Sequence, residues 1–348
     1  MEGSSIRSEL ATGVFVCSAQ AFLRLGLATT VLTGGALLLT RELPFLYFLG
    51  FLFAAARLYD PLGVVLQNIA ATFNTKLQIE RMRSILEQPV QTGTEDFRPN
   101  RYDITFDHVS FAYREGDGVL EDVSFTAKQG EVTALIGPSG GGKSTVANLL
   151  TRFWDVKSGT VLVRGKDIRN VRLSDLMNHI SMVFQRVYLF QDSIYNNIAM
   201  GRPDATRDEV IEAAKKGPDV MILSWPCRIG FDTMIGEGGE TLSGGEKQRI
   251  SIARCLLKDA PIVILDEATA SVDPENEHEI QEALSALVRG KTIITIAHRL
   301  ATIQNADRIL VVEDGRIAQH GTHQELMSQE GTYRNFIEIR QRAEGWRI

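Results

Sequence analysis

Two long apolar runs near the amino terminus limit the possible folds of this chain more than any other feature. The only charged residue between Ala11 and Thr40 is Arg24, and a second run from Leu43 to Thr75 carries only Arg57 and Asp60. Each run is long enough to supply the roughly 20 apolar residues that a helix needs to cross a bilayer. The sequence therefore predicts two membrane spans, over residues 12–40 and 43–67.

Two other interpretations of these runs fit less well. A buried hairpin of a soluble protein is rarely so long and so poor in charge. A cleaved signal peptide would have a shorter apolar run and a basic start, whereas the first ten residues here are mixed in charge. Lys76, Arg81 and Arg83 follow the second span closely, which predicts that its carboxyl-terminal side lies in the cytoplasm and continues there as a helix.

A polar segment separates the apolar part from the rest of the chain. Residues 88–100 contain two prolines and a glycine and have no apolar period, which is typical of a linker. Residues 1–87 are then a partial membrane domain. Beyond the linker, β-rich runs alternate with helical stretches, which predicts a layered α/β domain over residues 101–348. The predicted strands are Ile104–Phe106, Val132–Ile136, Ile262–Leu265, Thr292–Ile296 and Ile309–Val312.

Charge and cysteine content exclude several functional classes. The chain has 37 basic and 43 acidic residues, a formal net charge of −6, and no basic block, so we do not expect a nucleic-acid partner. Its three cysteines, Cys17, Cys227 and Cys255, are scattered and odd in number. A disulfide framework or a zinc site is therefore not expected, and a reducing compartment fits.

A glycine-rich segment between a predicted strand and a helical stretch has the pattern of a phosphate-binding loop, G-x-x-x-x-G-K-S. Glycines let the backbone N–H groups point at phosphate oxygens, and the helix amino terminus adds a positive dipole. Lys143 is expected to reach the β- and γ-phosphates of a nucleotide, and the Ser144 hydroxyl to ligate Mg²⁺. The alternative is a glycine-rich turn that precedes a lysine by chance. The predicted ATP-binding residues are Gly137, Pro138, Ser139, Gly140, Gly141, Gly142, Lys143, Ser144 and Thr145.

Two acidic residues follow a later apolar strand, at its carboxyl end. Open α/β sheets bind ligands at this edge. Asp266 is therefore expected to hold Mg²⁺, directly or through water, and Glu267 to orient and deprotonate the attacking water. A solvated acidic pair would be the favoured interpretation if no phosphate-binding loop stood upstream.

A second anion site is predicted ahead of the apolar helical stretch from Ile250 to Leu257. Ser243 is expected to cap this helix, with Gly244 and Gly245 leaving N–H groups open to phosphate. Two phosphate-binding elements in one nucleotide domain make sense if each chain offers its second element to a partner's nucleotide. This predicts two ATP molecules sandwiched in a head-to-tail dimer.

Together these residues resemble the nucleotide-binding domain of ABC transporters, from about Tyr102 to the end of the chain. The resemblance implies that Tyr113 stacks on adenine and that Gln185 senses Mg²⁺, the attacking water and the membrane domain. It implies that Asp273, in a segment that carries signals across the dimer, belongs to the ATP site, and that His298 contacts the γ-phosphate and holds the hydrolytic geometry with Glu267. Taken alone, His298 would more often be a surface or capping residue.

Small departures from the family pattern are Glu246, where glutamine is commoner, and Val272, where leucine is commoner. Neither removes an essential serine, glycine or carboxylate, so active hydrolysis is expected. Exporter-type members of the family fuse six spans to the nucleotide domain, and the two predicted here resemble the last two. The resemblance thus implies an amino-terminally truncated chain, in which residues 236–240 resemble a segment that contacts the coupling loops.

Arg57 and Asp60 lie three residues apart, and therefore on one face of the second helix. Charges at membrane depth are costly and tend to mark a transport pathway or a mutual ion pair. Both interpretations stay open. The stretch from Arg57 to Pro61, with residues 268–274, is also similar to bacterial exporter-fold members associated with siderophores.

The predicted function is that of an ATP-hydrolysing subunit of an ABC transporter, a multi-pass protein of the cell membrane with its ATP-binding domain in the cytoplasm. The expected cofactors are ATP and Mg²⁺. The expected partners are an identical or related second subunit, the lipid bilayer and an unidentified solute. The alternatives are a soluble ABC ATPase acting on nucleic acid or ribosomes, which the apolar spans disfavour, and a non-catalytic ATP-binding module, which Glu267 and His298 disfavour.

Overall fold

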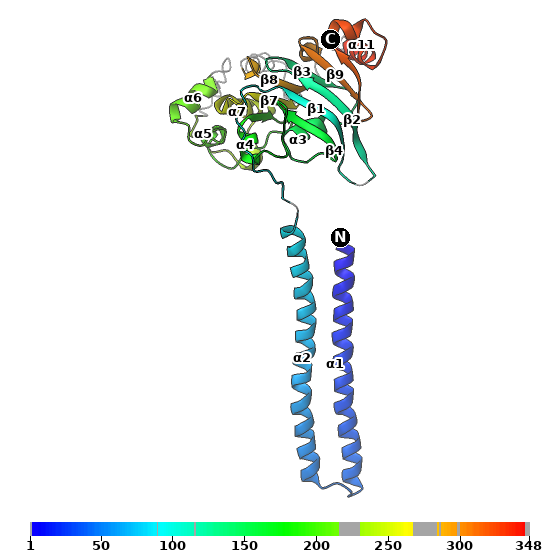
Figure 1. Ribbon diagram of the computed structural model, residues 1–348. Coiled ribbons are helices and arrows are strands. Elements are labelled where there is room, and N and C mark those ends of the chain that lie inside the picture. Colours follow the sequence, from blue (N-terminus) through cyan, green and yellow to red (C-terminus); the bar gives the residue numbers. More distant parts are fainter. Residues whose placement is uncertain are drawn as a thin grey trace. The chain divides into compact units, whose positions relative to one another are not determined.

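The computed structural model describes residues 2–88, 90–114, 116–215, 230–266, 284, 287–297 and 300–344. The chain divides into two compact units, Met1–Val90 and Gln91–Ile348 (Figure 1). The boundary between the units falls inside the expected linker.

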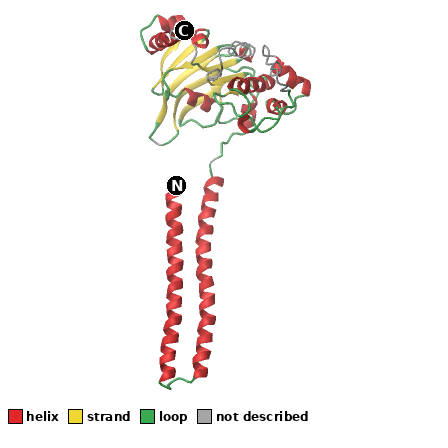
Figure 2. Ribbon diagram, turned by 180° about the vertical axis from the view of Figure 1, so that it is seen from behind, coloured by secondary structure: helices red, strands yellow, loops and turns green. Residues whose placement is uncertain are grey.

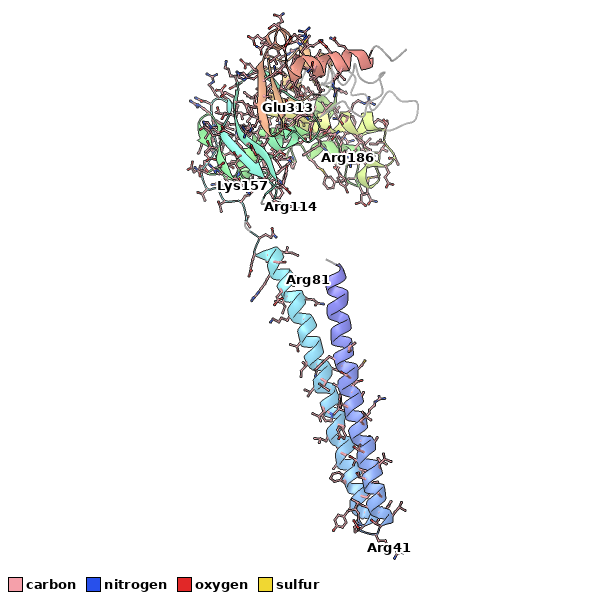
Figure 3. The ribbon with its side chains drawn as sticks, turned by 90° about the vertical axis from the view of Figure 1, so that its right-hand side faces the viewer. Arg41, Arg81, Arg114, Lys157, Arg186 and Glu313 are labelled. Atoms are coloured by element: carbon pink, nitrogen blue, oxygen red, sulfur yellow. The ribbon has the colours of Figure 1, made fainter. Side chains whose placement is uncertain are left out.

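The first unit is a pair of long antiparallel helices, α1 (Glu2–Leu39) and α2 (Phe45–Leu86). Arg41 lies in the turn between them and Arg81 near the other end of α2 (Figure 3). Small residues occur where the helices meet, since a Cβ at Gly34 would lie 2.4 Å from the Phe48 ring.

The helix pair has the length and polarity of a membrane segment. The apolar parts suited to crossing a bilayer are Gly13–Leu39 and Phe45–Ile69. Their apolar stretches are almost fully exposed, with 6% of the first and 0% of the second buried inside the protein. Two helices alone cannot cover these apolar faces, so lipid or further helices must do so. The 42 residues of α2 extend well past the apolar part, which agrees with a helix that continues beyond a bilayer. The Asp60 side chain lies outside the described part, so the predicted Arg57–Asp60 pair is not seen.

The second unit is built on two sheets (Figure 2). The larger has the strand order β10-β9-β3-β8-β7-β6, and its five strands from β9 to β6 are parallel while β10 runs antiparallel at the edge. The smaller sheet is antiparallel, in the order β2-β1-β4-β5. The strands are β1 (Ile104–Ala112), β2 (Gly118–Ala127), β3 (Val132–Ile136), β4 (Ser158–Val163), β5 (Lys166–Asp167), β6 (Ile180–Val183), β7 (Ile262–Asp266), β8 (Thr292–Ile296), β9 (Arg308–Glu313) and β10 (Arg316–Gly321). Every predicted strand is present.

Helices cover the sheets and connect their strands. They are α3 (Lys143–Leu150), α4 (Leu173–Asn178), α5 (Ile194–Ala199), α6 (Arg207–Lys215), the 3₁₀ turn η1 (Glu237–Gly239), α7 (Gly244–Lys258), α9 (Leu300–Gln304), α10 (His323–Met327) and α11 (Thr332–Glu344). The main core contains apolar side chains of both sheets and of α3, among them Phe106, Val146 and Leu149. Helix α3 is therefore held by both sheets.

Arg152, two residues after α3, is 1% exposed and makes its hydrogen bonds inside the protein. Its guanidinium donates to the carbonyl oxygens of Ile168 (2.9 Å), Val171 (3.1 Å) and Thr92 (2.8 Å), and it forms an ion pair with Asp155 at 2.9 Å. A buried charge is tolerated only when it is paired and hydrogen-bonded in this way. Arg152 thereby ties the start of the second unit to the end of α3.

Residues 91–97, which we call the latch, pack against the rest of the second unit. Two successive amides, those of Thr94 and Glu95, donate to the Asn170 carbonyl at 3.0 Å, and the Arg172 amide donates to the Glu95 carbonyl at 3.0 Å. Phe97 is 2% exposed and joins the main core. Much of the expected linker is thus fixed structure rather than free chain.

A single glycine in the latch offers a test of this attachment. A Cβ at Gly93 would lie 2.1 Å from the Val171 carbonyl oxygen, and the residue has φ +150°. We expect Gly93→Ala to detach the latch at a cost of about 1–3 kcal/mol, because the carbonyl belongs to backbone that cannot retreat cheaply. Amide hydrogen exchange of residues 91–97 should then speed up while that of β3 and α3 does not.

The matched control is Thr94→Ala, because this exposed neighbour contributes its backbone and not its side chain to the hydrogen bonds described. Unchanged exchange of the latch in Gly93→Ala would contradict this account.

Candidate functional site

The phosphate-binding loop connects the buried strand β3 to α3, as predicted. Gly137 has φ +137° and Gly142 has φ +101°. A Cβ at Gly137 would lie 2.0 Å from the Val312 carbonyl oxygen, and one at Gly142 would lie 2.6 Å from the Leu120 side chain. Glycine is required at these positions both by backbone conformation and by close packing.

Lys143 begins α3 and curls back over the loop. Its side chain is 6% exposed, and Nζ donates to the carbonyl oxygens of Gly137 (3.0 Å) and Pro138 (2.7 Å). The ammonium charge therefore lies at the amino terminus of a helix, where the dipole also favours an anion. Ser144 beside it is exposed. This combination suits the binding of a polyphosphate at the open face of the loop.

Further predicted site residues follow neighbouring strands of the parallel sheet. Gln185 lies two residues after β6 and is exposed, and Asp266 is the last residue of β7. Strand β7 pairs with β8, and β8 with β3, whose carboxyl end leads into the phosphate-binding loop. The sheet thus brings Gln185, Asp266 and the loop to the same edge, the ligand-binding edge of such folds. Glu267, Asp273 and His298 lie outside the described residues.

The donor set at this edge fits a magnesium ion. Ser144 offers a hydroxyl, Asp266 a carboxylate and Gln185 an amide oxygen, and Mg²⁺ prefers oxygen ligands from one or two protein groups together with substrate phosphates. Among the residues that the structure describes, no group of three or more histidines, cysteines or acids forms a metal cage. A site completed by nucleotide phosphates is the arrangement that these residues suit.

The second predicted anion element begins α7. Ser243 is its N-cap: the hydroxyl accepts from the Glu246 amide (3.3 Å), and the Glu246 carboxylate accepts from the Ser243 amide (2.7 Å). This reciprocal capping box fixes the helix start. Ser243 and Gly244 remain exposed, while Gly245 is buried. The carboxylate of Glu246 places a negative charge at the helix end that is predicted to receive phosphate.

Tyr113 follows the end of β1, and its side chain is 41% exposed. Its ring is nearly perpendicular to those of Phe111 and Trp154, with centroids 4.9 and 5.3 Å away. The hydroxyl lies 3.2 Å from Oγ1 of Thr145, in the first turn of α3, and accepts from the Asn148 side-chain amide at 3.2 Å. The aromatic side chain predicted to stack on a base is therefore adjacent to α3.

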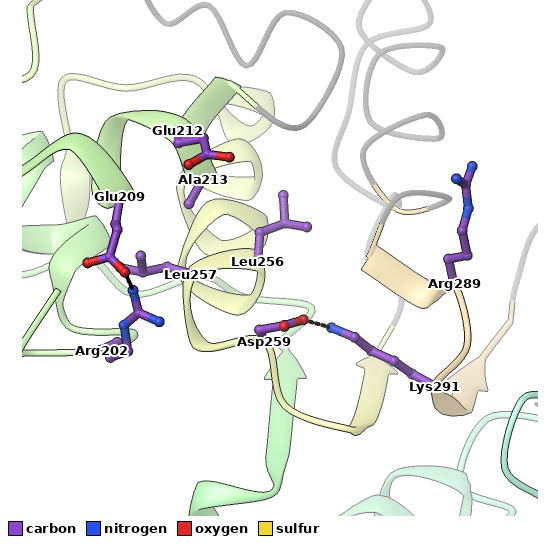
Figure 4. Close-up of a pocket in the computed structure, with 9 residues that line it drawn as sticks. All are labelled: Arg202, Glu209, Glu212, Ala213, Leu256, Leu257, Asp259, Arg289 and Lys291. Carbon is purple, nitrogen blue, oxygen red and sulfur yellow. Dashed lines mark hydrogen bonds and ion pairs between the residues drawn. The ribbon is translucent and has the colours of Figure 1, made fainter. Parts of the chain in front are cut away.

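A separate cavity of about 350 Å³ lies at the carboxyl end of α7 (Figure 4). Basic and acidic side chains line it in equal number, and they include the Arg202–Glu209 pair and the Lys291–Asp259 pair at 2.8 Å. None of the predicted ATP-site residues lines this cavity, and its charges are balanced. It gives no reason to place the phosphate site elsewhere.

Sequence reasoning missed Arg152, Asn148 and Trp154. The i,i+3 spacing of Arg152 and Asp155 was one available signal of an ion pair. No sequence signal marks the contacts of Asn148 and Trp154 with Tyr113, because these form only when β1 packs beside α3.

Comparison with known proteins identifies the nucleotide unit. The ABC transporter family model matches residues 120–270. The chain is similar to the ATP-dependent lipid A-core flippase of Legionella pneumophila, with 39% identity over 342 residues, which are 97% of this chain and 58% of the flippase. It is also similar to the putative multidrug export ATP-binding/permease protein YgaD of Bacillus subtilis, with 49% identity over 238 residues, which are 68% of this chain and 41% of that protein.

A solved structure gives the same result. The structure of a bacterial Atm1-family ABC exporter with ATP bound matches with a TM-score of 0.72 and 33% identity, over 97% of this chain and 60% of that chain. The present chain spans 41–60% of the lengths of these three proteins. These matches confirm the predicted fold class: residues 120–270 match the ABC transporter family, and the chain is similar to part of the length of exporter-type ABC proteins.

Proposed function

We propose that this chain is the ATP-hydrolysing part of a membrane ABC exporter, in which ATP binding and hydrolysis drive a solute across the bilayer. The observation that carries the proposal is the shared sheet edge, where the phosphate-binding loop, Asp266 and Gln185 lie at the carboxyl ends of β3, β7 and β6 in one parallel sheet. The apolar helix pair and the similarity to export proteins support a membrane location, with the ABC domain in the cytoplasm.

In this mechanism one set of residues binds the nucleotide and another promotes its hydrolysis. The loop amides and Lys143 bind and neutralise the phosphates, and Tyr113 stacks on the base. Mg²⁺, held by Ser144 and Asp266 with Gln185 near, would supply positive charge at the β- and γ-phosphates. Glu267 orients and deprotonates the attacking water, and His298 holds the γ-phosphate in place.

The capped start of α7 is explained by a dimer. We infer that Ser243, Gly244 and Gly245 of one protomer contact the nucleotide of the other, with Asp273 nearby, so that ATP joins two nucleotide domains head to tail. Closure on binding and reopening on hydrolysis would move the attached helices, which is how a nucleotide cycle produces alternating access. The partner is an identical or a related chain.

The proposal also concerns the chemical class of the transported solute. The relatives are named for lipid A-core and for multidrug export, and these names suggest an amphipathic or polar solute rather than a specific compound. The predicted role of Arg57 and Asp60 in lining a pathway stays a prediction, as does the likeness to siderophore-associated members.

Lys143→Met tests the phosphate site. Methionine preserves the length of the buried side chain and removes its charge, so the fold should persist while ATP hydrolysis falls about 100-fold or more. ATPase turnover in detergent or lipid measures this, with Lys157→Met as the control because Lys157 is an exposed lysine. Equal turnover in the two variants would show that Lys143 does not act on the phosphates.

Glu267→Gln tests the catalytic step and the dimer together. The amide cannot deprotonate water, so turnover should fall about 100-fold or more while ATP still binds and an ATP-joined dimer accumulates. Light scattering with and without ATP reports the dimer, and Glu330→Gln, on an exposed acid, is the control. A variant that neither hydrolyses ATP nor dimerises would refute the homodimer and point to a different partner chain.

Glu246→Gln tests the charge at the start of α7. Glutamine still forms the capping box but removes a negative charge from the place where a partner's phosphate is proposed to bind. In the Glu267→Gln background we expect ATP-dependent dimerisation to become about two- to fivefold tighter, with a smaller gain at high salt. Weaker dimerisation would mean instead that the carboxylate itself contacts the partner's nucleotide.

A further inference from the structure

Tyr113 lies in a place where its ring would ordinarily be free to move. It is the residue directly after β1, in a bend, and 41% of its surface is exposed. An exposed aromatic side chain on a bend loses rotamer freedom when a ligand binds, and this loss weakens the binding. The contacts that restrain the ring beforehand therefore affect how well it can serve as a binding surface.

Two ring contacts limit the motion of Tyr113 without stacking on it. The Phe111 ring lies at 88° to it and the Trp154 ring at 87°, with Phe111 only 4% exposed. Perpendicular contacts of this kind are favourable for aromatic pairs. Neither neighbour stacks face to face with the Tyr113 ring.

The polar contacts of Tyr113 come from α3. Asn148 Nδ2 donates to the Tyr113 hydroxyl at 3.2 Å, and that hydroxyl lies 3.2 Å from Thr145 Oγ1. A phenol that accepts one hydrogen bond still has its own proton to donate, so the two contacts are compatible. Thr145 and Asn148 are three residues apart and therefore share a face of the helix.

We propose that Asn148 is a positioning residue, which fixes the base-binding ring of Tyr113 relative to the phosphate-binding loop. This inference rests on the proposed ATP function of the site. Helix α3 begins at the loop that cradles phosphates and carries Thr145 in its first turn and Asn148 in its second. One buried helix then presets the spacing between the phosphate cradle and the base surface, so the site favours a whole nucleotide over an isolated polyphosphate.

The experiment compares the affinities of ATP and of inorganic tripolyphosphate, measured by calorimetry on the full chain in detergent. Asn148→Leu preserves the size of the side chain and suits a helix, but it cannot donate to the Tyr113 hydroxyl. We expect ATP to bind about three- to tenfold more weakly, with tripolyphosphate unaffected, because only ATP uses the ring. Asn305→Leu, the same change at an exposed asparagine, should leave both affinities as they are.

A double-mutant cycle shows whether Asn148 acts through the Tyr113 hydroxyl. Tyr113→Phe retains the ring and removes the hydroxyl, so it should weaken ATP binding by a similar factor. The double variant should be no weaker than Tyr113→Phe alone, since that change already removes the hydrogen bond from Asn148 together with the contact to Thr145.

The outcomes distinguish a failure of the positioning role of Asn148 from a failure of the proposed ATP function. If Asn148→Leu weakens ATP and tripolyphosphate equally, or if its effect adds to that of Tyr113→Phe, the positioning role is wrong while nucleotide binding stands. If the native chain binds neither ligand, the proposed ATP function fails, and this inference fails with it.

Discussion

The burial of α3 between the two sheets is the constraint on which the rest of the nucleotide unit depends. Apolar side chains of this short helix, among them Val146 and Leu149, enter the main core with residues of both sheets. Three separate features are attached to it: the phosphate-binding loop at its start, the Tyr113 contact on its side and Arg152 just past its end. A shift of α3 would therefore disturb the phosphate cradle, the base surface and the latch together.

The features predictable from the sequence are those that short segments encode by themselves. The buried strand before Gly137 and the glycines that follow it determine a phosphate-binding loop locally, and the capping box of Ser243 and Glu246 likewise depends on residues three apart. The positions of the strands, the ligand-binding edge of the sheet and the two long helices were predicted from patterns of this kind. The roles of Tyr113 and Gln185 were predicted from the family resemblance alone, because the residues around them in the sequence indicate no function.

The features that escaped prediction depend on segments far apart in the chain. A lone arginine after a helix resembles a solvated surface cation, yet Arg152 is buried because carbonyl groups of residues 92, 168 and 171 converge on it. The polar composition of residues 91–97 is typical of free linker, yet its backbone hydrogen bonds, the isolated β-bridge of Glu95 with Val171 and the burial of Phe97 make it part of the domain. Composition describes a segment's own solubility and not the residues, far away in the sequence, against which it packs.

The latch also determines how mechanical load would enter the nucleotide unit. The chain that leaves α2 reaches Thr92 before it reaches β1, and the Thr92 carbonyl is bonded to Arg152. Tension along this connection would therefore reach the hydrogen bonds of Gln91 and Thr92 with Arg152, just past the end of α3, before it reaches the strands of the smaller sheet. Within the second unit, the first attachment of the incoming chain is thus beside the end of the helix that begins at the phosphate-binding loop, and not at β1, the strand that follows the linker in sequence.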